Sequence, residues 1–179
     1  MTIPVVCIIG SSGSGKTTLL LKLIPEFKRR GYRIATVKHH SHAGFEIDQP
    51  GKDSYLYAQA GSDHVVIAAP DKVACYYRVE REPSLDEITR DIRDVDLILV
   101  EGYKRAGKPA IEIRRGDLGL RPLLADSELL AIASNVPLTS TLPVFDLNDA
   151  AGMAEFIEER FLDGEDMKHD DRRGWFPET

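Results

Sequence analysis

The residues best suited to chemistry form a glycine-rich loop near the start of the chain. Residues 10–17 read GSSGSGKT and match the spacing GxxxxGK[ST] in full. Small residues let the backbone wrap closely around a phosphate, so that several amide groups converge on its oxygens. Lys16 would place a charge on the β- and γ-phosphates, and the Thr17 hydroxyl is positioned to ligate magnesium. The predicted nucleotide-binding residues here are Gly10, Ser11, Ser12, Gly13, Ser14, Gly15, Lys16, Thr17 and Thr18.

A carboxylate is expected beside this loop, because magnesium bound with a nucleotide is also held by an acid at the end of a neighbouring strand. Residues 96–102 read DLILVEG, an apolar run with an acid at each end. Ligands of parallel sheets bind at the carboxyl ends of the strands, which makes Glu101 the better-placed acid and puts Asp96 at the wrong end. We predict Glu101 as a magnesium ligand alongside Thr17 and, with Lys16, as a catalytic residue.

A polar loop with three histidines follows the second predicted strand. It spans residues 39–52, contains two glycines and a proline, and shows no apolar period. His39, His40 and His42 allow two interpretations: a transition-metal site, or a switch loop whose side chains contact nucleotide, magnesium or a partner. We favour the switch loop because it follows strand two of a phosphate-loop fold. Asp48 is the predicted magnesium contact within it.

The elements that must position these residues alternate between strands and helices. The run at residues 5–9 is continuously apolar, as expected of a central parallel strand. Leu19, Leu20, Leu23 and Phe27 form an apolar stripe on the helix predicted at residues 16–30. Further helices are expected at residues 53–60, from Ser84, and at 149–161. Further strands are expected at 33–38, 64–69, 73–79, 96–100, 110–114, 131–134 and 144–146.

This order predicts an α/β chain: a three-layer P-loop NTPase fold with a mostly parallel central sheet and a β-hairpin extension formed by residues 64–79. Residues 1–162 are expected to form one nucleotide-binding domain, and 179 residues are enough for one sizeable core. Residues 163–179 are rich in charge and are predicted to be a partly flexible tail.

Composition narrows the range of partners. The net charge of −6 argues against a generic nucleic-acid binder, which needs a basic face to displace counterions. The early apolar run, residues 3–9, is interrupted by Pro4 and is far shorter than the ~18 residues of a membrane helix. The sequence has two cysteines without metal-site spacing. A reducing, cytoplasmic compartment is therefore expected, with no contact to a membrane.

Three segments together resemble one known family. They are GSSGSGKTT at residues 10–18, VKHHSHAGFEIDQPGKDS at 37–54 and DLILVEGYKRAGKPAIEIRR at 96–115. Over about residues 5–114 the chain closely resembles the MobB family of molybdopterin-guanine dinucleotide biosynthesis proteins. The segments are long and unusual, which makes a chance likeness improbable.

The resemblance implies a GTP-binding accessory protein of molybdenum cofactor biosynthesis. Such a protein would assist a MobA-type guanylyltransferase in attaching GMP to molybdopterin, with weak Mg²⁺-dependent GTP hydrolysis. It implies a homodimer in which the region of residues 73–79 supplies pairing surface. The loop at 39–52 would lie near the nucleotide, and residues 101–104 would close the site. The basic residues Lys104, Arg105 and Lys108 are candidate contacts for a molybdopterin phosphate, and equally consistent with a solvated loop.

Recognition of guanine depends on this likeness alone, because the Asn-Lys-x-Asp element of GTPases is absent. The segment AIASN at residues 131–135 occupies the place of a base-reading loop, and Asn135 stands where an aspartate would accept both guanine N–H groups. Two other functions remain as alternatives. One is a small-molecule P-loop kinase, although no arginine-rich lid is evident. The other is a metal-delivery GTPase using the loop at His39–His42.

Overall fold

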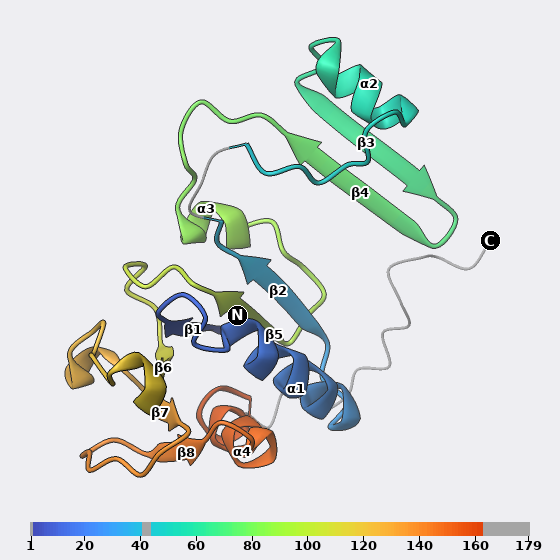
Figure 1. Ribbon diagram of the computed structural model, residues 1–179. Coiled ribbons are helices and arrows are strands. Elements are labelled where there is room, and N and C mark those ends of the chain that lie inside the picture. Colours follow the sequence, from blue (N-terminus) through green and yellow to red (C-terminus); the bar gives the residue numbers. More distant parts are fainter. Residues whose placement is uncertain (1, 41–43, 163–179) are drawn as a thin grey trace. The chain divides into compact units, whose positions relative to one another are not determined.

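The computed structural model describes residues 2–40 and 44–162 (Figure 1). The strands in chain order are β1 (Val5–Gly10), β2 (Ile34–Lys38), β3 (His64–Ala69), β4 (Lys72–Tyr77), β5 (Leu97–Glu101), β6 (Ala110–Arg114), β7 (Ala131–Ser134) and β8 (Val144–Asp146). The α-helices are α1 (Lys16–Arg29), α2 (Asp53–Gln59), α3 (Leu85–Thr89) and α4 (Ala150–Phe161). Two 3-10 helices, η1 (Gly116–Leu118) and η2 (Asp126–Glu128), were not predicted from the sequence.

The strands form two separate sheets. Six of them pair in the order β2-β5-β1-β6-β7-β8, and every pair is parallel. Strands β3 and β4 form an antiparallel hairpin of their own. The predicted α/β fold, with its parallel central sheet and hairpin extension, is confirmed. The chain divides into two compact units, which we call the P-loop unit (described residues of 1–39 and 85–179) and the hairpin unit (described residues of 40–84).

The core of the P-loop unit lies on both faces of the parallel sheet. Successive residues of each strand point to opposite faces, so Val6 and Ile8 of β1 pack on one face while Cys7 and Ile9 pack on the other. Helices α1 and α4 contact each other and cover the first face (Figure 1). The predicted helical stripe is confirmed, since its four residues are all buried there. The second face is covered by α3 and by loop residues such as Tyr103 and Leu124.

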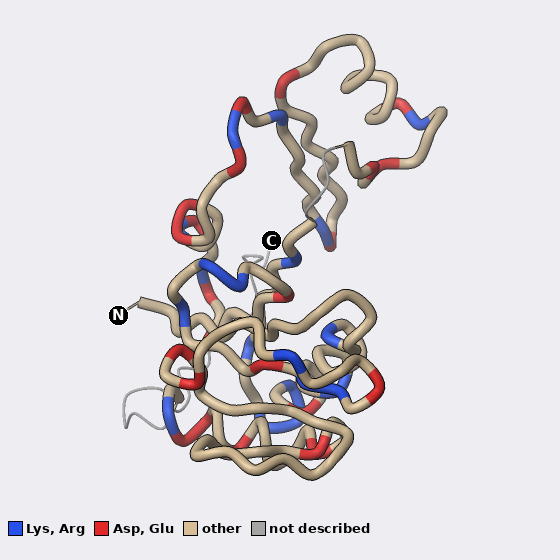
Figure 2. The backbone as a smooth tube through the Cα atoms, turned by 60° about the vertical axis from the view of Figure 1, so that its left-hand side comes forward, with Lys and Arg blue, Asp and Glu red and all other residues tan. Residues whose placement is uncertain are grey.

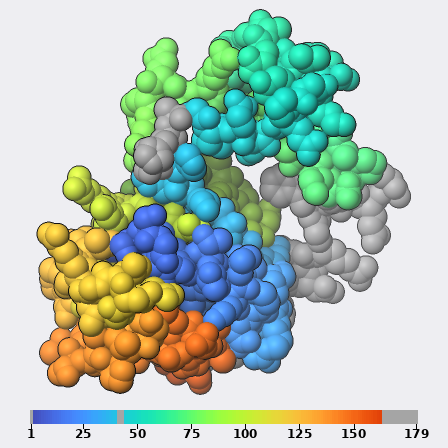
Figure 3. Space-filling view, in the orientation of Figure 1, coloured from blue at the N-terminus to red at the C-terminus, as the bar shows by residue number. Residues whose placement is uncertain are grey.

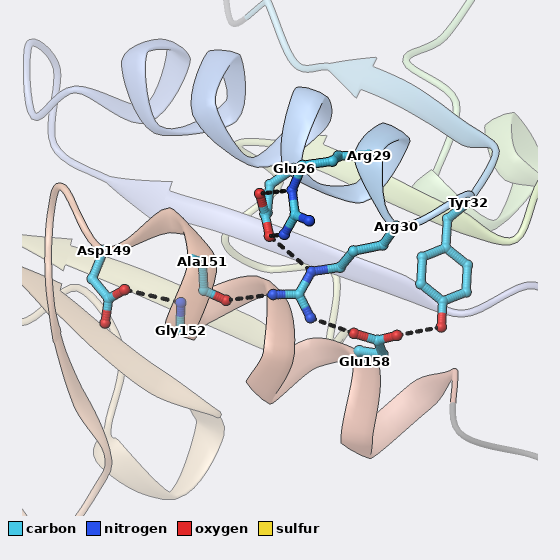
Figure 4. A network of polar contacts seen from close by, with 8 residues as sticks. All are labelled: Glu26, Arg29, Arg30, Tyr32, Asp149, Ala151, Gly152 and Glu158. Atoms are coloured by element: carbon cyan, nitrogen blue, oxygen red, sulfur yellow. Dashed lines mark hydrogen bonds and ion pairs between the residues drawn. The ribbon is translucent and has the colours of Figure 1, made fainter.

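Charged side chains hold α1 against α4 (Figure 4). Glu26 accepts hydrogen bonds from Arg29 and from Arg30, with nitrogen–oxygen distances of 2.7 Å and 2.9 Å. Arg30 also pairs with Glu158 and donates to the carbonyl oxygen of Ala151 at 3.0 Å. The hydroxyl of Tyr32 donates to the other carboxylate oxygen of Glu158 at 2.7 Å. The network therefore fixes the last turn of α1 to α4.

One face of the hairpin is partly covered. Val65 of β3 lies opposite Tyr76 of β4, on the same face of the hairpin, and α2 contacts β3. The Tyr76 hydroxyl donates to the carboxylate of Asp48 at 2.9 Å and lies 3.1 Å from the carbonyl oxygen of Ser54. The residues of the other face are His64, Val66, Ala68, Val73, Cys75 and Tyr77, and all of them are exposed.

No helix in the described part of the chain is long and apolar enough to cross a bilayer. Along the backbone, Lys and Arg segments are interspersed with Asp and Glu segments (Figure 2). The predicted tail at residues 163–179 lies outside the described residues.

Candidate nucleotide-binding site

The glycine-rich segment connects the carboxyl end of β1 to the first turn of α1. Gly10 has a φ of 158°, and a Cβ atom there would overlap the hydroxyl of Ser14, so a larger residue would push the loop apart. Gly15 has a φ of 96° and forms the N-cap of α1. The amide groups at the helix start and the positive end of the helix dipole therefore face the loop, which suits an anion.

Lys16 lies across this loop. Its ammonium donates to the carbonyl oxygens of Gly10 and Ser11 at 3.0 Å and 2.8 Å. Burial lowers the pKa of Lys16, the nearby charge of Glu101 raises it, and Lys38 lowers it further. The Ser14 hydroxyl is fully buried and bonds to none of the described residues. The loop thus contains a cation and an unsatisfied donor where the sequence predicts a phosphate.

The two predicted magnesium ligands of this unit lie side by side. The Thr17 hydroxyl donates to Glu101 Oε2 at 2.8 Å, although the residues are 84 positions apart in the sequence. Lys38 was not predicted, yet its ammonium lies 3.5 Å from Glu101 Oε1. The register explains this, because Lys38 is paired with Glu101 across β2 and β5. A hydroxyl and a carboxylate are the hard oxygen ligands that Mg²⁺ prefers, so these residues fit the ion.

A cavity of about 190 Å³ opens beside the phosphate loop. Its wall includes the predicted residues Thr18 and Asn135 together with Ser14 and Gly15. The remaining lining residues, which were not predicted, are Leu19, Lys22, Arg115, Leu147 and Asn148. In the space-filling view, the dark-blue start of the chain, the yellow segment after β6 and the orange segment around β8 meet on one face (Figure 3). The cavity therefore adjoins both the phosphate loop and Asn135, the predicted base-reading residue.

Asn135 is held by the loop that follows β6. Its side-chain oxygen accepts the Gly116 amide at 2.9 Å, and its amino group lies 3.3 Å from Asp117 Oδ1. Asp117 in turn accepts two hydrogen bonds from Arg115, at 2.9 Å and 3.0 Å, which lower the pKa of its carboxyl group. An acid therefore lies next to Asn135. It belongs to the loop after β6 and not to the predicted base-reading segment at residues 131–135.

The histidine loop is divided between the two units. His39 belongs to the P-loop unit, where its ring lies 4.5 Å from that of Tyr103, and His40 belongs to the hairpin unit. His42 lies outside the described residues. Among the residues that the structure describes, no group of three or more His, Cys, Asp or Glu side chains is arranged to hold a metal ion.

Asp48 lies in the hairpin unit, with its carboxylate bonded to the Tyr76 hydroxyl and to the Gln49 amide at 2.7 Å. A hydrogen bond involving Ser54 is the main cause that lowers the pKa of Asp48. Its magnesium contact stays a prediction.

The two arginines of β6 and the next loop differ in their surroundings. Arg114 is largely buried and pairs with Glu112 and Asp126, at 3.1 Å and 2.9 Å. Arg115 is more exposed and lines the cavity beside the phosphate loop.

Comparison with known proteins identifies the family of the chain. The family model for MobB, molybdopterin guanine dinucleotide synthesis protein B, matches residues 5–135. The chain is 39% identical over 163 residues to the molybdopterin-guanine dinucleotide biosynthesis adapter protein of Escherichia coli, covering 88% of this chain and 93% of that protein. The protein of the same name from Haemophilus influenzae is 40% identical over 159 residues, covering 87% of this chain and 88% of that one.

Solved structures of related proteins share the fold. A crystal structure of molybdopterin-guanine biosynthesis protein B superposes with a TM-score of 0.68 at 30% identity, over 87% of this chain and 99% of that one. Bacillus subtilis MobB gives a TM-score of 0.71 at 24% identity, over 90% of this chain and 100% of that one. The family model covers well over half of the chain, and the relatives match over nearly their whole length. The chain therefore belongs to the MobB family.

Proposed function

We propose that this protein is an adapter of molybdopterin-guanine dinucleotide biosynthesis that binds GTP with Mg²⁺ on the loop at residues 10–17. The observation that carries the proposal is the contact between Thr17 and Glu101, which places a hydroxyl and a carboxylate together beside Lys16. The names of the E. coli and H. influenzae relatives support the biosynthetic role.

Each residue of the phosphate loop has a defined part in this proposal. Lys16 exchanges its two carbonyl contacts for phosphate oxygens, and the loop amides and the Ser14 hydroxyl donate to the same anion. Thr17 and Glu101 hold the magnesium ion, which would neutralise charge on the β- and γ-phosphates. Lys38 orients the carboxylate of Glu101 through its second oxygen. Without an evident water-positioning group, hydrolysis is expected to be slow.

The wall of the neighbouring cavity would read the base. Guanine presents two adjacent N–H donors, for which a carboxylate is the best acceptor. Asp117 lies next to Asn135, a residue of that wall, although its carboxylate is bonded to Arg115 in this structure. If the guanine donors displaced Arg115, residues of two loops would together take the place of the missing Asn-Lys-x-Asp element. Asn135 would then position Asp117 and accept a donor itself.

The proposed partners are a MobA-type guanylyltransferase and a second copy of this chain, in the cytoplasm. The open face of the hairpin supports self-association, because Val66, Val73 and Tyr77 are 61%, 53% and 58% exposed there. An isolated two-stranded hairpin is marginally stable in water, so a second copy would provide the missing cover. Molybdopterin itself is a further candidate ligand.

A titration of the purified protein with GTP and ATP, each with and without Mg²⁺, tests the nucleotide proposal. We expect GTP to bind more tightly than ATP and to depend on Mg²⁺. Lys16→Ala should weaken binding by about a hundredfold or more, because it removes a charge-assisted contact to two phosphates. Glu101→Gln should remove most of the advantage given by Mg²⁺ while leaving metal-free binding unchanged. Asp117→Ala should reduce the preference for GTP over ATP.

The matched control is Lys28→Ala, which removes an exposed lysine at the far end of α1. It should bind GTP as the wild type does. Equal binding of GTP by the wild type and Lys16→Ala would refute the proposed site. A preference for ATP would instead favour the small-molecule kinase.

A further inference from the structure

A second cavity of the P-loop unit is separate from the phosphate loop. It has a volume of about 550 Å³, within the range of about 300–1,000 Å³ that is usual for small-molecule sites. Part of its wall comes from Pro109, which precedes β6, and from Glu128, which precedes β7. Lys104 and Arg105, which also line it, follow the carboxyl end of β5. No residue lines both this cavity and the one beside the phosphate loop, so the two cavities are separate.

The connection between β5 and β6 presents most of this wall. It makes a turn in which the Ala106 amide donates to the Tyr103 carbonyl at 2.9 Å, with Tyr103 at a φ of 52°. Lys104 and Arg105 form the tip of that turn. Its far end is anchored to the sheet, because the Cys7 amide donates to the Pro109 carbonyl at 2.9 Å. Hydrogen bonds hold the backbone at both ends of the connection, so the positions of Lys104 and Arg105 in the chain are fixed.

The charges of this cavity are predominantly positive. Lys104, Arg105 and Lys108 line it together with one acid, Glu128. Lys104 and Arg105 are exposed and make no side-chain hydrogen bond or ion pair with any described residue. Lys108 pairs with Asp86 of α3 at 2.5 Å, so three cations face two carboxylates when this neighbour is counted. This local excess lies on a chain whose net charge is −6.

We propose that this cavity binds a small organic phosphate, held by Lys104, Arg105 and Lys108, with its apolar part against Leu124 and Pro109. An arginine fork and two ammonium groups match a phosphate dianion, whereas one cation would be enough for a carboxylate. A volume of this size suits a small molecule better than a nucleic-acid strand. The proposal goes beyond the nucleotide site and does not depend on its occupant.

Phenyl phosphate is the probe, and benzoate is its matched carboxylate. Each is titrated into ¹⁵N-labelled protein, once with Mg²⁺ and GDP present and once in the Lys16→Ala variant, so that the phosphate loop does not capture the probe. We expect saturable shifts of the amides of residues 104–108 and 124–128 with phenyl phosphate and weaker shifts with benzoate. The double variant Lys104→Ala/Arg105→Ala should weaken binding on the order of tenfold or more.

Two further variants separate a specific effect on binding from general damage to the fold. Asp86→Asn releases Lys108 from its partner and should tighten binding several-fold, an effect that general damage to the fold would not produce. Lys28→Ala removes a lysine far from the cavity and should leave the affinity unchanged. Equal affinity of the double variant and wild type would overturn the proposal, as would shifts confined to residues 10–17. Failure of GTP binding in the separate titration would refute the nucleotide proposal and leave this one standing.

Discussion

In the P-loop unit, continuously apolar strands are covered on one face by α1 and α4 and on the other by α3 and several loops. In the hairpin unit, α2 buries none of its residues, and among the apolar side chains of β3 and β4 only Val65 is buried. The first unit closes its own core, and the second presents apolar surface. A unit that lacks a core of its own is better suited to contacting a partner than to holding a ligand rigidly.

Truncation of one apolar side chain in each unit tests this difference most strongly. Phe27 is fully buried, and its ring packs edge-to-face on that of Tyr32 with the ring centroids 6.2 Å apart. Phe27→Ala should therefore lower the free energy of unfolding by about 3–5 kcal/mol. Leu56 of α2 is 53% exposed, and Leu56→Ala should cost less than about 1 kcal/mol. Urea unfolding followed by circular dichroism, at a dilution where the chain is monomeric, measures both. A comparable loss in the two variants would show that the hairpin unit has a core after all.

A charge on the open face of the hairpin tests what that face is for. Val66→Lys places an ammonium among exposed apolar side chains. If two copies pair through this face as proposed, the variant should shift from dimer to monomer in sedimentation velocity, since a buried unpaired charge is costly. Leu21→Lys is the matched control, because Leu21 is 67% exposed on α1 of the other unit. If Val66→Lys sediments as the wild type does, the proposed pairing through this face is wrong.

The two cysteines provide a second readout of the same variant. Cys75 shares the open face with Val66 and is exposed, whereas Cys7 is buried in the sheet. If the proposed pairing covers this face, alkylation of Cys75 should be faster in Val66→Lys than in the wild type. Cys7 should stay unmodified in both native proteins, because burial, only partly opposed by the charge of Lys108, raises its pKa to about 12.

The elements of both units could be predicted from local patterns, because continuous apolar runs, a helical stripe and the hairpin spacing are properties of neighbouring residues. The phosphate loop was predicted for the same reason. Lys38 beside Glu101 was not, since that contact depends on β5 lying between β2 and β1, and strand order leaves no local signal. Asp117 was missed in the same way. In the sequence, position 135 holds an asparagine where an aspartate would read guanine, whereas the structure brings an acid to it from the loop after β6.

The smallest expected effect concerns the charged side chains that join α1 to α4. The described part of the hairpin unit has one helix, α2, and so no such helix pair. Hydrogen bonds from Arg29 and then Arg30 lower the pKa of Glu26 from 4.5 to about 2. A carboxyl group whose pKa is lowered by folding stabilises the native state above its unfolded pKa, and this contribution is lost as the pH falls through the folded value. The unfolding midpoints of wild type and Glu26→Gln should therefore differ most above pH 4.5 and converge between pH 4.5 and 2.

Urea unfolding of both proteins across this pH range measures the convergence. Glu155→Gln is the control, since Glu155 is an exposed acid on α4 with no side-chain partner among the described residues. Its difference from wild type should be small at every pH. A difference for Glu26→Gln that stays constant down to pH 2 would mean that the carboxylate contributes through packing rather than charge. The contact between α1 and α4 would then rest on the apolar core and on the pair between Arg30 and Glu158.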